Sequence, residues 1–206
     1  MNDFARLRHF EDLYAACEDP WNVRGAWYEQ RKRAVLLASL ARARYRNAFE
    51  PGCGNGELSA ALASRCERLL ACDGAANALD AARRRLPNAD VHGVRFEQRR
   101  LPEDWPRDAS FDLIVLSELA YYFDAATVRA LLRRAAASLA PGGELLMCHF
   151  TPDFDDRVLP TATVHALAHA TPGLASTLHH RDEAFVLDVW RRTPEAQAGA
   201  QSGAHP

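Results

Sequence analysis

Residues 49–56 read FEPGCGNG and join two segments of different pattern. The preceding segment, 45–50, is typical of a short strand that runs into a turn, whereas 57–66 is rich in Ala and Leu and predicts a helix. Three glycines at alternate positions allow a tight turn and let a ligand lie against bare main chain. The start of the helix adds free N–H donors for a polar or anionic group. The stretch therefore predicts a strand–loop–helix unit that binds a ligand.

Strand-like and helix-like segments alternate from about residue 46 to residue 150. The segment FDLIVL at 111–116 is almost wholly apolar, as a strand covered on both faces would be. This alternation predicts an α/β fold, with a mostly parallel sheet, right-handed crossovers and helices on both faces. The other strands of this part are expected at 69–72, 91–97 and 144–149, and the other helices at 75–86 and 125–139.

The segments outside this alternating part predict a helical cap and a closing hairpin. Apolar spacing indicates helices at 3–18 and 27–44. Two strands, 174–180 and 184–190, flank a turn and predict an antiparallel hairpin. We expect one domain over residues 1–193, made of a cap (1–44), a core (45–150), a cover with a helical patch at 164–168 (151–173) and the hairpin (174–193), followed by a disordered tail (194–206).

The composition predicts a soluble, cytoplasmic protein that binds neither nucleic acid nor membranes. The 27 acidic and 25 basic residues give a net charge of −2, which argues against binding that neutralises many phosphates. Lys32 is the only lysine. No apolar signal-peptide region lies near the start, and no apolar run approaches the ~20 residues that span a bilayer. Five cysteines without a C-x-x-C pair or zinc-finger spacing predict free thiols and no metal site.

Two carboxylates near the glycine loop narrow the class of ligand. Asp73 follows the next expected strand, where an acid can accept both hydroxyl hydrogens of a ribose. Glu50 lies just before the turn, where it would repel a pyrophosphate and attract an ammonium group. The dinucleotide pattern G-x-G-x-x-G fails because its third glycine position is Glu57. S-adenosylmethionine carries an ammonium group and a sulfonium cation and has no phosphate. A dinucleotide site and a turn without a ligand remain the alternatives.

Several motifs together resemble the class I S-adenosylmethionine-dependent methyltransferases. They are EPGCGNG at 50–56, Asp73, FDLIVLSE at 111–118 and LAPGG at 139–143. A narrower resemblance, to the nodulation protein S family, rests on DPW at 19–21, YEQRK at 28–32 and SELAYY at 117–122. Members of that family N-methylate the deacetylated sugar amine of a chitooligosaccharide.

The resemblance implies a Rossmann-like fold with a seven-stranded sheet whose last two strands form the hairpin. It implies S-adenosylmethionine as cofactor, S-adenosylhomocysteine as product and a small-molecule acceptor, with a saccharide amine as the first to test. Two positions depart from the family. Pro51 stands where an aliphatic residue is more frequent, and EQRRL at 97–101 lacks the Asp that meets the adenine amino group. Main-chain groups near Arg99 to Leu101 are expected to serve instead.

The candidate cofactor-binding residues share the loop, the strand ends or the cap. They are Trp21, Tyr28, Glu50, Gly52, Cys53, Gly54, Gly56, Asp73, Gly74, Arg99, Leu101 and Ser117. The resemblance implies that Trp21 and Tyr28 close over the cofactor; the alternative is that they anchor the N-terminal helix by aromatic packing.

Three residues are candidates for the chemistry of the acceptor. Glu118 follows the strongest strand and could orient or deprotonate an amine, or counter its charge. His149 ends the next strand and is either a general base or a hydrogen-bonded structural histidine. Tyr122, beside Tyr121, either lines the acceptor pocket or packs on the following helix.

Other functions stay open from the sequence. A methyltransferase could act on the oxygen or nitrogen of another small metabolite, and its oligomeric state could be monomer or homodimer. A cofactor-binding protein without catalysis is more remote, because the glycine loop, the expected ribose acid and Ser117-Glu118 occur together. A dehydrogenase is a fourth alternative.

Overall fold

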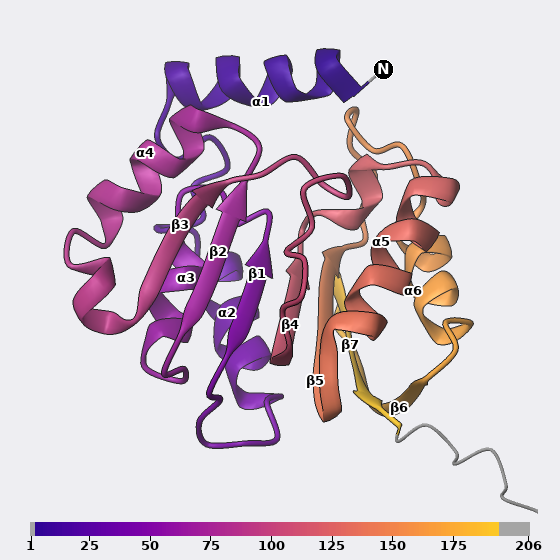
Figure 1. Cartoon of the computed structure of the whole chain (residues 1–206). Coiled ribbons are helices and arrows are strands. Elements are labelled where there is room, and N and C mark those ends of the chain that lie inside the picture. The colour runs from indigo at the N-terminus through magenta and orange to yellow at the C-terminus, as the bar shows by residue number, and fades with distance from the viewer. Residues whose placement is uncertain (1–2, 194–206) are drawn as a thin grey trace, which may run out of the picture.

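The computed structural model describes residues 3–193, so the predicted tail lies outside the described residues. Its centre is a seven-stranded sheet in the order β3-β2-β1-β4-β5-β7-β6 (Figure 1). The five N-terminal strands run parallel to one another, and β7 pairs antiparallel with both β5 and β6. The predicted mostly parallel sheet with an antiparallel C-terminal hairpin is confirmed. The strands are β1 (Ala48–Pro51), β2 (Leu69–Asp73), β3 (Val94–Gln98), β4 (Phe111–Ser117), β5 (Leu139–Phe150), β6 (Leu174–Arg181) and β7 (Phe185–Arg192).

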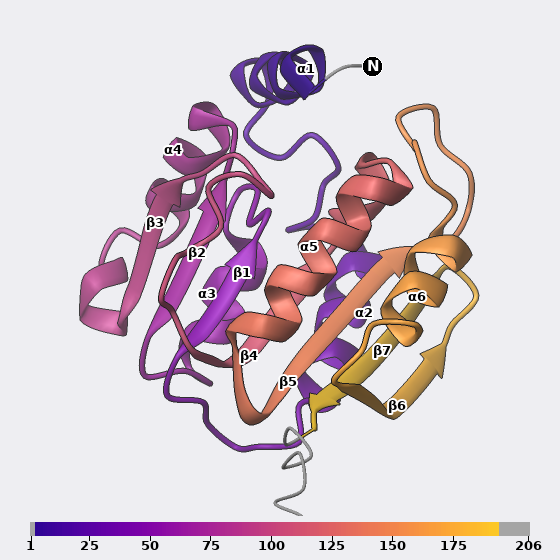
Figure 2. The ribbon, with the colours of Figure 1, turned by 45° about the vertical axis from the view of Figure 1, so that its right-hand side comes forward.

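Helices cover both faces of the sheet, as predicted. Alternate residues of β4 face opposite layers: Leu113 and Val115 share a core with α2 and α3, and Ile114 and Leu116 share one with α5 and α6. Figure 2 shows α5 and α6 in front of the sheet and α2 behind it. The helices are α1 (Asp3–Ala16), α2 (Trp27–Ala38), α3 (Glu57–Ala63), α4 (Ala76–Arg85), α5 (Ala125–Ser138) and α6 (Thr161–His169), with short 3₁₀ turns at Ala89–His92 and Ala120–Tyr122.

Several predicted element bounds are wrong, because contacts distant in sequence satisfy the backbone. The helix expected at 27–44 ends at Ala38, and the Arg65 guanidinium donates hydrogen bonds to the carbonyls of Leu37, Arg42 and Ala43. The bond to Leu37 satisfies a carbonyl in the last turn of α2, and the other two hold the segment that follows the helix. The helix expected at 57–66 likewise stops at Ala63.

The third and fifth strands also differ from expectation. The start of the segment expected as a strand at 91–97 is a 3₁₀ turn, and Gly93 at φ +70° leads into β3. The Pro-Gly-Gly at 141–143 lies inside β5 rather than before it. Leu139 pairs with Phe111 and Glu144 pairs with Leu113, so the extra residues of this irregular register, which include the Pro-Gly-Gly, lie in β5.

Gly93 gives a stability prediction with a matched control. A Cβ at Gly93 would lie 2.1 Å from the Glu67 carbonyl oxygen, at a φ of +70°. We expect Gly93→Ala to lower the free energy of unfolding by at least ~2–3 kcal/mol, from left-handed strain plus the clash. Gly173→Ala has a similar φ, +79°, but open space around the Cβ, so it should lose only the strain, about 1 kcal/mol. Urea unfolding of both variants measures the difference; equal losses would contradict the clash.

The carboxyl ends of the parallel strands form the edge that carries the functional residues. Helix α1 lies across this edge (Figure 1). The Glu11 carboxylate of α1 accepts hydrogen bonds from the N–H groups of Ala76, at 2.6 Å, and Asn77, at 3.0 Å. These are first-turn amides of α4, so the contact both caps α4 and fixes α1 over the edge.

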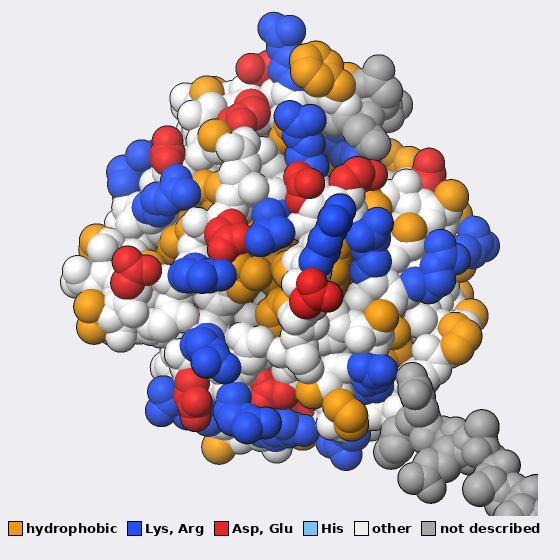
Figure 3. Space-filling view, viewed as in Figure 1, with side chains coloured by type: hydrophobic (Ala, Val, Ile, Leu, Met, Phe, Trp, Pro, Cys, Tyr) orange, Lys and Arg blue, Asp and Glu red, His pale blue; other side chains and the backbone are white. Residues whose placement is uncertain are grey.

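The charged surface is mixed. On the face shown in Figure 3, acidic and basic side chains lie beside one another over most of the surface. No helix within residues 3–193 combines the length and the apolar character needed to cross a bilayer.

Candidate active site

A cavity of ≈ 600 Å³ opens at the carboxyl edge of the sheet. It extends from the glycine loop to the aromatic side chains around Glu118. The structure brings ten of the predicted site residues to its wall. They are Trp21, Tyr28, Glu50, Gly52, Cys53, Gly54, Asp73, Ser117, Glu118 and Tyr122.

The glycine loop is held by main-chain hydrogen bonds that leave its outer surface bare. The N–H groups of Gly52 and Cys53 both donate to the Cys72 carbonyl, at 2.7 and 2.9 Å. Gly54 has φ +53°, and a Cβ there would lie 2.5 Å from the Tyr14 hydroxyl. A residue with a side chain would therefore be strained and would fill the space between the loop and α1.

Asp73 ends β2 with its carboxylate fixed beside the loop. Its Oδ2 accepts the Gly54 N–H at 3.0 Å and its Oδ1 accepts the Ala75 N–H at 2.9 Å. Each oxygen keeps further acceptor capacity. Burial raises the pKa of Asp73, and the N–H groups around it partly oppose that rise. The carboxylate therefore has a fixed position in the cavity wall and free acceptor capacity for further donors.

Glu50 lies deeper in the cavity wall. It is 2% exposed, and its Oε2 accepts a hydrogen bond from the Ser59 hydroxyl at 2.6 Å. Burial raises the pKa of Glu50 to about 8, although the Ser59 hydrogen bond acts in the opposite direction. At neutral pH this carboxyl group is therefore largely protonated until a cation approaches it.

This raised pKa predicts proton release when a cationic ligand binds. A ligand ammonium favours the ionised form of Glu50, so its pKa falls on binding and a proton leaves. Between about pH 6 and pH 7, where an α-amino group is still charged, affinity for S-adenosylhomocysteine should therefore rise with pH. Calorimetry in buffers of different ionisation enthalpy would measure the released proton. Glu50→Gln should remove that proton release, and a wild-type signal in this variant would contradict the assignment.

The charge of the cavity fits an adenosyl sulfonium better than a dinucleotide. Seven acidic residues line it: Glu29, Glu50, Glu57, Asp73, Glu118, Asp155 and Asp156. The basic residues in the wall are Lys32 and Arg33. A pyrophosphate would meet net repulsion there, whereas a cation is attracted. The residues present therefore fit S-adenosylmethionine.

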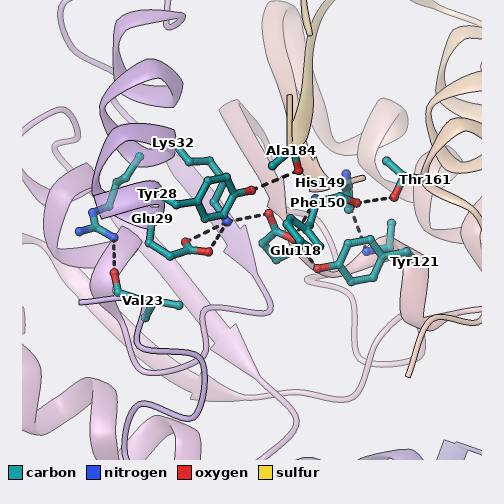
Figure 4. A network of polar contacts seen from close by, with 12 residues as sticks. Val23, Tyr28, Glu29, Lys32, Glu118, Tyr121, His149, Phe150, Thr161 and Ala184 are labelled. Atoms are coloured by element: carbon teal, nitrogen blue, oxygen red, sulfur yellow. Dashed lines mark hydrogen bonds and ion pairs between the residues drawn. The ribbon is translucent and has the colours of Figure 1, made fainter. Parts of the chain in front are cut away.

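Glu118 organises the other end of the cavity (Figure 4). It follows β4 with φ +54°, a left-handed conformation that is strained for a residue with a side chain. Its Oε1 accepts from the Lys32 ammonium at 2.8 Å, and its Oε2 accepts from the Tyr121 hydroxyl and from the Phe150 N–H, the latter at 3.1 Å. Three donors from three parts of the chain thus fix one carboxylate.

Aromatic side chains form the wall around Glu118. Both tyrosines, Tyr121 and Tyr122, line the cavity together with Phe150 and Phe154. Tyr122 also packs edge-to-face on Phe10 of α1, with ring centroids 4.9 Å apart. Tyr122 therefore lines the cavity and also packs on α1, which is not the following helix that the sequence suggested.

Trp21 and Tyr28 likewise combine packing with a position in the wall. The Trp21 ring lies edge-to-face on Tyr14 of α1, at 5.7 Å between centroids. The Tyr28 ring packs on Phe150 and Phe185, and its hydroxyl donates to the Ala184 carbonyl at 3.3 Å.

His149 is placed outside the cavity wall, with both ring nitrogens occupied. It is fully buried; Nε2 accepts the Ala120 N–H at 3.2 Å and Nδ1 lies 3.1 Å from Nε2 of His165. Because an amide can only donate, the His149 proton sits on Nδ1 and is donated to His165, whose Nδ1 in turn lies 2.5 Å from the Asp188 carboxylate. Burial lowers the pKa of His149. This arrangement fits the structural role and leaves no free lone pair for a general base.

Four further predicted residues do not line the cavity. Gly56 starts α3 at φ +77°, where a Cβ would meet Ala82 at 2.9 Å. The guanidinium of Arg99 pairs with Glu97 at 2.5 Å and donates to the Asp104 carbonyl at 2.8 Å. Leu101 packs against the core beneath α5, and Gly74 lies against Leu7 of α1. Their contacts in this structure are with the protein itself.

Sequence reasoning missed several residues of the wall. Phe10 and Tyr14 of α1 line the cavity, as do Glu29, Lys32 and the loop carboxylates Asp155 and Asp156. The apolar spacing through Phe10 and Tyr14 predicts a helix, but it does not indicate which part of the fold that helix contacts. Glu29 and Lys32 lie within the motif YEQRK and carried no separate signal.

Within residues 3–193, no three His, Cys, Asp or Glu side chains are grouped closely enough to hold a metal ion. The five cysteines are free thiols, and four of them are buried.

Comparison with known proteins relates this chain to methyltransferases. A family model for a methyltransferase domain matches residues 48–143. Nodulation protein S of Rhizobium tropici is 36% identical over 134 residues, which cover 64% of this chain and 55% of that protein. The match thus spans little more than half the length of this curated relative.

Solved structures extend the likeness over most of the chain. A candidate methyltransferase from Pseudomonas syringae is 48% identical, with a TM-score of 0.71 over 81% of this chain and 100% of that chain. The N-methyltransferase NodS from Bradyrhizobium japonicum WM9, in complex with S-adenosyl-l-homocysteine, shares the fold at 24% identity, with a TM-score of 0.78 over 93% of this chain and 99% of that chain. With the glycine loop, Asp73 at the end of β2 and the seven-stranded sheet, these relationships show that the chain belongs to the class I S-adenosylmethionine-dependent methyltransferases.

Proposed function

We propose that this protein transfers a methyl group from S-adenosylmethionine to an amine nitrogen of a small molecule. The observation that carries the proposal is a single cavity with two unlike ends. Gly54 and Asp73 offer bare main chain and a ribose acceptor at one end. Glu118 offers a fixed carboxylate among aromatic side chains at the other. The similarity to nodulation protein S, named an N-methyltransferase in its solved structure, supports an amine, and an amino sugar is the first acceptor to test.

The cofactor supplies an electrophilic methyl group: as the nitrogen lone pair forms the N–C bond, the C–S bond breaks, and sulfur keeps the electron pair as the neutral thioether S-adenosylhomocysteine. Gly52, Gly54 and Asp73 would hold its adenosyl part, and Glu50 its ammonium group. Because the leaving group is neutral, the protein needs no acid to expel it. Holding the nitrogen in line with the methyl group can supply up to ~7–11 kcal/mol of the barrier.

At the acceptor end of the cavity, one proton has to be removed from the amine. An amine that arrives as ammonium must lose a proton before its lone pair can attack. The Glu118 carboxylate lines the cavity, attracts the ammonium and accepts its proton at Oε1, where its remaining acceptor capacity lies. The aromatic wall of Tyr121, Tyr122 and Phe154 limits water around the nitrogen.

Methyl incorporation into matched acceptors tests the proposal. Glucosamine and deacetylated chitooligosaccharides should gain the labelled methyl group of S-adenosylmethionine at nitrogen, as located by mass spectrometry. N-acetylglucosamine should gain none, because its amide nitrogen has no basic lone pair. If hydroxyl groups of these or other small metabolites were methylated while every amine stayed unmodified, the protein would be an O-methyltransferase and the proposal would fail.

A further inference from the structure

Lys32 is the only lysine of the chain, and all 24 other basic side chains counted as Lys or Arg are arginine. It lies on α2 at 5% exposure, inside the cavity wall. Its ammonium nitrogen is 2.9 Å from the Glu29 carboxylate and 2.8 Å from the Glu118 carboxylate. Figure 4 shows the three side chains converging between α2 and the end of β4. A sequence that otherwise uses arginine thus keeps its one lysine at the acceptor end.

The chemistry of the contact suits an ammonium group. The ammonium nitrogen Nζ is a compact charge with three N–H donors, so it can lie within 3 Å of two carboxylates at once. The guanidinium of an arginine is wider and planar, and it spreads its donors over a larger area. The Tyr28 ring centroid lies 5.0 Å from Nζ, which adds a cation–π contact. Burial alone would lower the pKa of Lys32, but the charges of Glu118 and Glu29 outweigh it and raise that pKa. Lys32 therefore remains a cation at neutral pH.

The cluster Glu29–Lys32–Glu118 carries two negative charges and one positive charge. Oε2 of Glu118 already accepts from Tyr121 and Phe150, so its free capacity is on Oε1. Among the described residues, Glu29 has Lys32 as its side-chain hydrogen-bond partner, at either carboxylate oxygen. The cluster thus has a net charge of −1 and unused acceptor positions that face the cavity.

We propose that Lys32 is a positioning residue that holds Glu29 and Glu118 together as a site for one positive charge, the ammonium group of the methyl acceptor. The inference rests on the proposed amine methylation. Without Lys32, two adjacent carboxylates would repel each other and share a proton. With Lys32 present, its ammonium group contacts both carboxylates and offsets one of their two formal negative charges, so an incoming ammonium brings the cluster to neutrality.

The single lysine permits a test that does not depend on catalysis. Protein labelled with ¹³C-lysine, with S-adenosylhomocysteine bound, gives one ε-methylene signal, that of Lys32. Methylammonium chloride, the smallest primary ammonium probe, should shift this signal saturably, and sodium chloride at equal ionic strength should not. Glu29→Gln removes one carboxylate and should weaken the methylammonium response at least ~10-fold. An unsaturable shift, or one that sodium chloride reproduces, would overturn the proposal.

Variants of Lys32 add a kinetic readout. Lys32→Met should raise KM for glucosamine at least ~10-fold while S-adenosylhomocysteine affinity stays within ~3-fold, because that ligand contacts the other end. Arg31→Met is the matched control: Arg31 lies on the same helix, is exposed and pairs with Asp182, and its loss should change neither constant. An unchanged KM in Lys32→Met would contradict the positioning role. If Lys32→Met does not fold, the Glu29→Gln titration decides the question alone.

The two proposals fail in different ways. A saturable methylammonium shift without methylation of any amine would refute the proposed function and leave the cation site standing. Methylation of glucosamine without any response of Lys32 to methylammonium would do the reverse.

Discussion

Asp73→Ala is expected to weaken binding of S-adenosylhomocysteine by about 10²–10⁴-fold. The carboxylate is the expected acceptor for two ribose hydroxyl groups, and hydrogen bonds to a charged acceptor contribute ~1.5–3 kcal/mol each. The same carboxylate holds the N–H groups of Gly54 and Ala75, so its loss also releases the glycine loop. Both effects act in the same direction. Calorimetric titration of wild type and variant measures the ratio of dissociation constants.

Two companion variants separate these contributions. Asp73→Asn keeps one carbonyl oxygen for a loop N–H but loses the charge, so its affinity should lie between those of wild type and Asp73→Ala. Asp80→Ala removes an exposed aspartate from α4 that pairs with Arg83 at 3.0 Å, and it should bind S-adenosylhomocysteine like wild type. Binding by Asp73→Ala within ~3-fold of wild type would mean that the ribose lies elsewhere.

Glu118→Gln is expected to lower kcat/KM for amine methylation by about 10²–10⁴-fold, the range associated with a positioned acid–base group. The amide has one acceptor oxygen in place of two, yet Lys32, Tyr121 and Phe150 all donate to this side chain. The amide NH₂ must therefore face a donor, and the negative charge that attracts the acceptor is lost. Because Glu118 lies at the acceptor end, affinity for S-adenosylhomocysteine should change by less than ~3-fold.

The control for this variant is Glu103→Gln, an exposed glutamate outside the cavity, which should keep wild-type activity. Unfolding midpoints of both variants should be compared, since the strained Glu118 backbone depends on its carboxylate contacts. Wild-type turnover by folded Glu118→Gln would exclude Glu118 from proton handling and from substrate attraction.

Local signals in the sequence predicted the fold and the residues that line the cavity near the glycine loop. The apolar run 111–116 indicates a buried strand, and the glycines within 49–56 indicate a turn between a strand and a helix. The strand, the loop and the position of Asp73 can therefore be predicted from short stretches of sequence. Element ends were less predictable. The Leu37 carbonyl near the end of α2 accepts a hydrogen bond from Arg65, which lies in the turn after α3, and no local pattern in 27–44 reveals that contact.

The acceptor end depends on distant pairs, and for this reason the sequence described it incompletely. Lys32 and Glu118 are 86 positions apart, and each looks like an ordinary charged residue on its own. His149 was a reasonable candidate base from its position at a strand end. Its ring nitrogens are taken by Ala120 and His165, 29 and 16 positions away, which is a matter of tertiary packing rather than of pattern.

Calorimetric titration of the purified protein with S-adenosylhomocysteine and, separately, with NAD⁺ would decide most directly which ligand the glycine loop binds. We expect saturable binding of S-adenosylhomocysteine at one site per chain and no saturable heat from NAD⁺. The reverse pattern, tight NAD⁺ binding with no response to the adenosyl compound, would contradict both the cofactor assignment and the proposed methyl transfer.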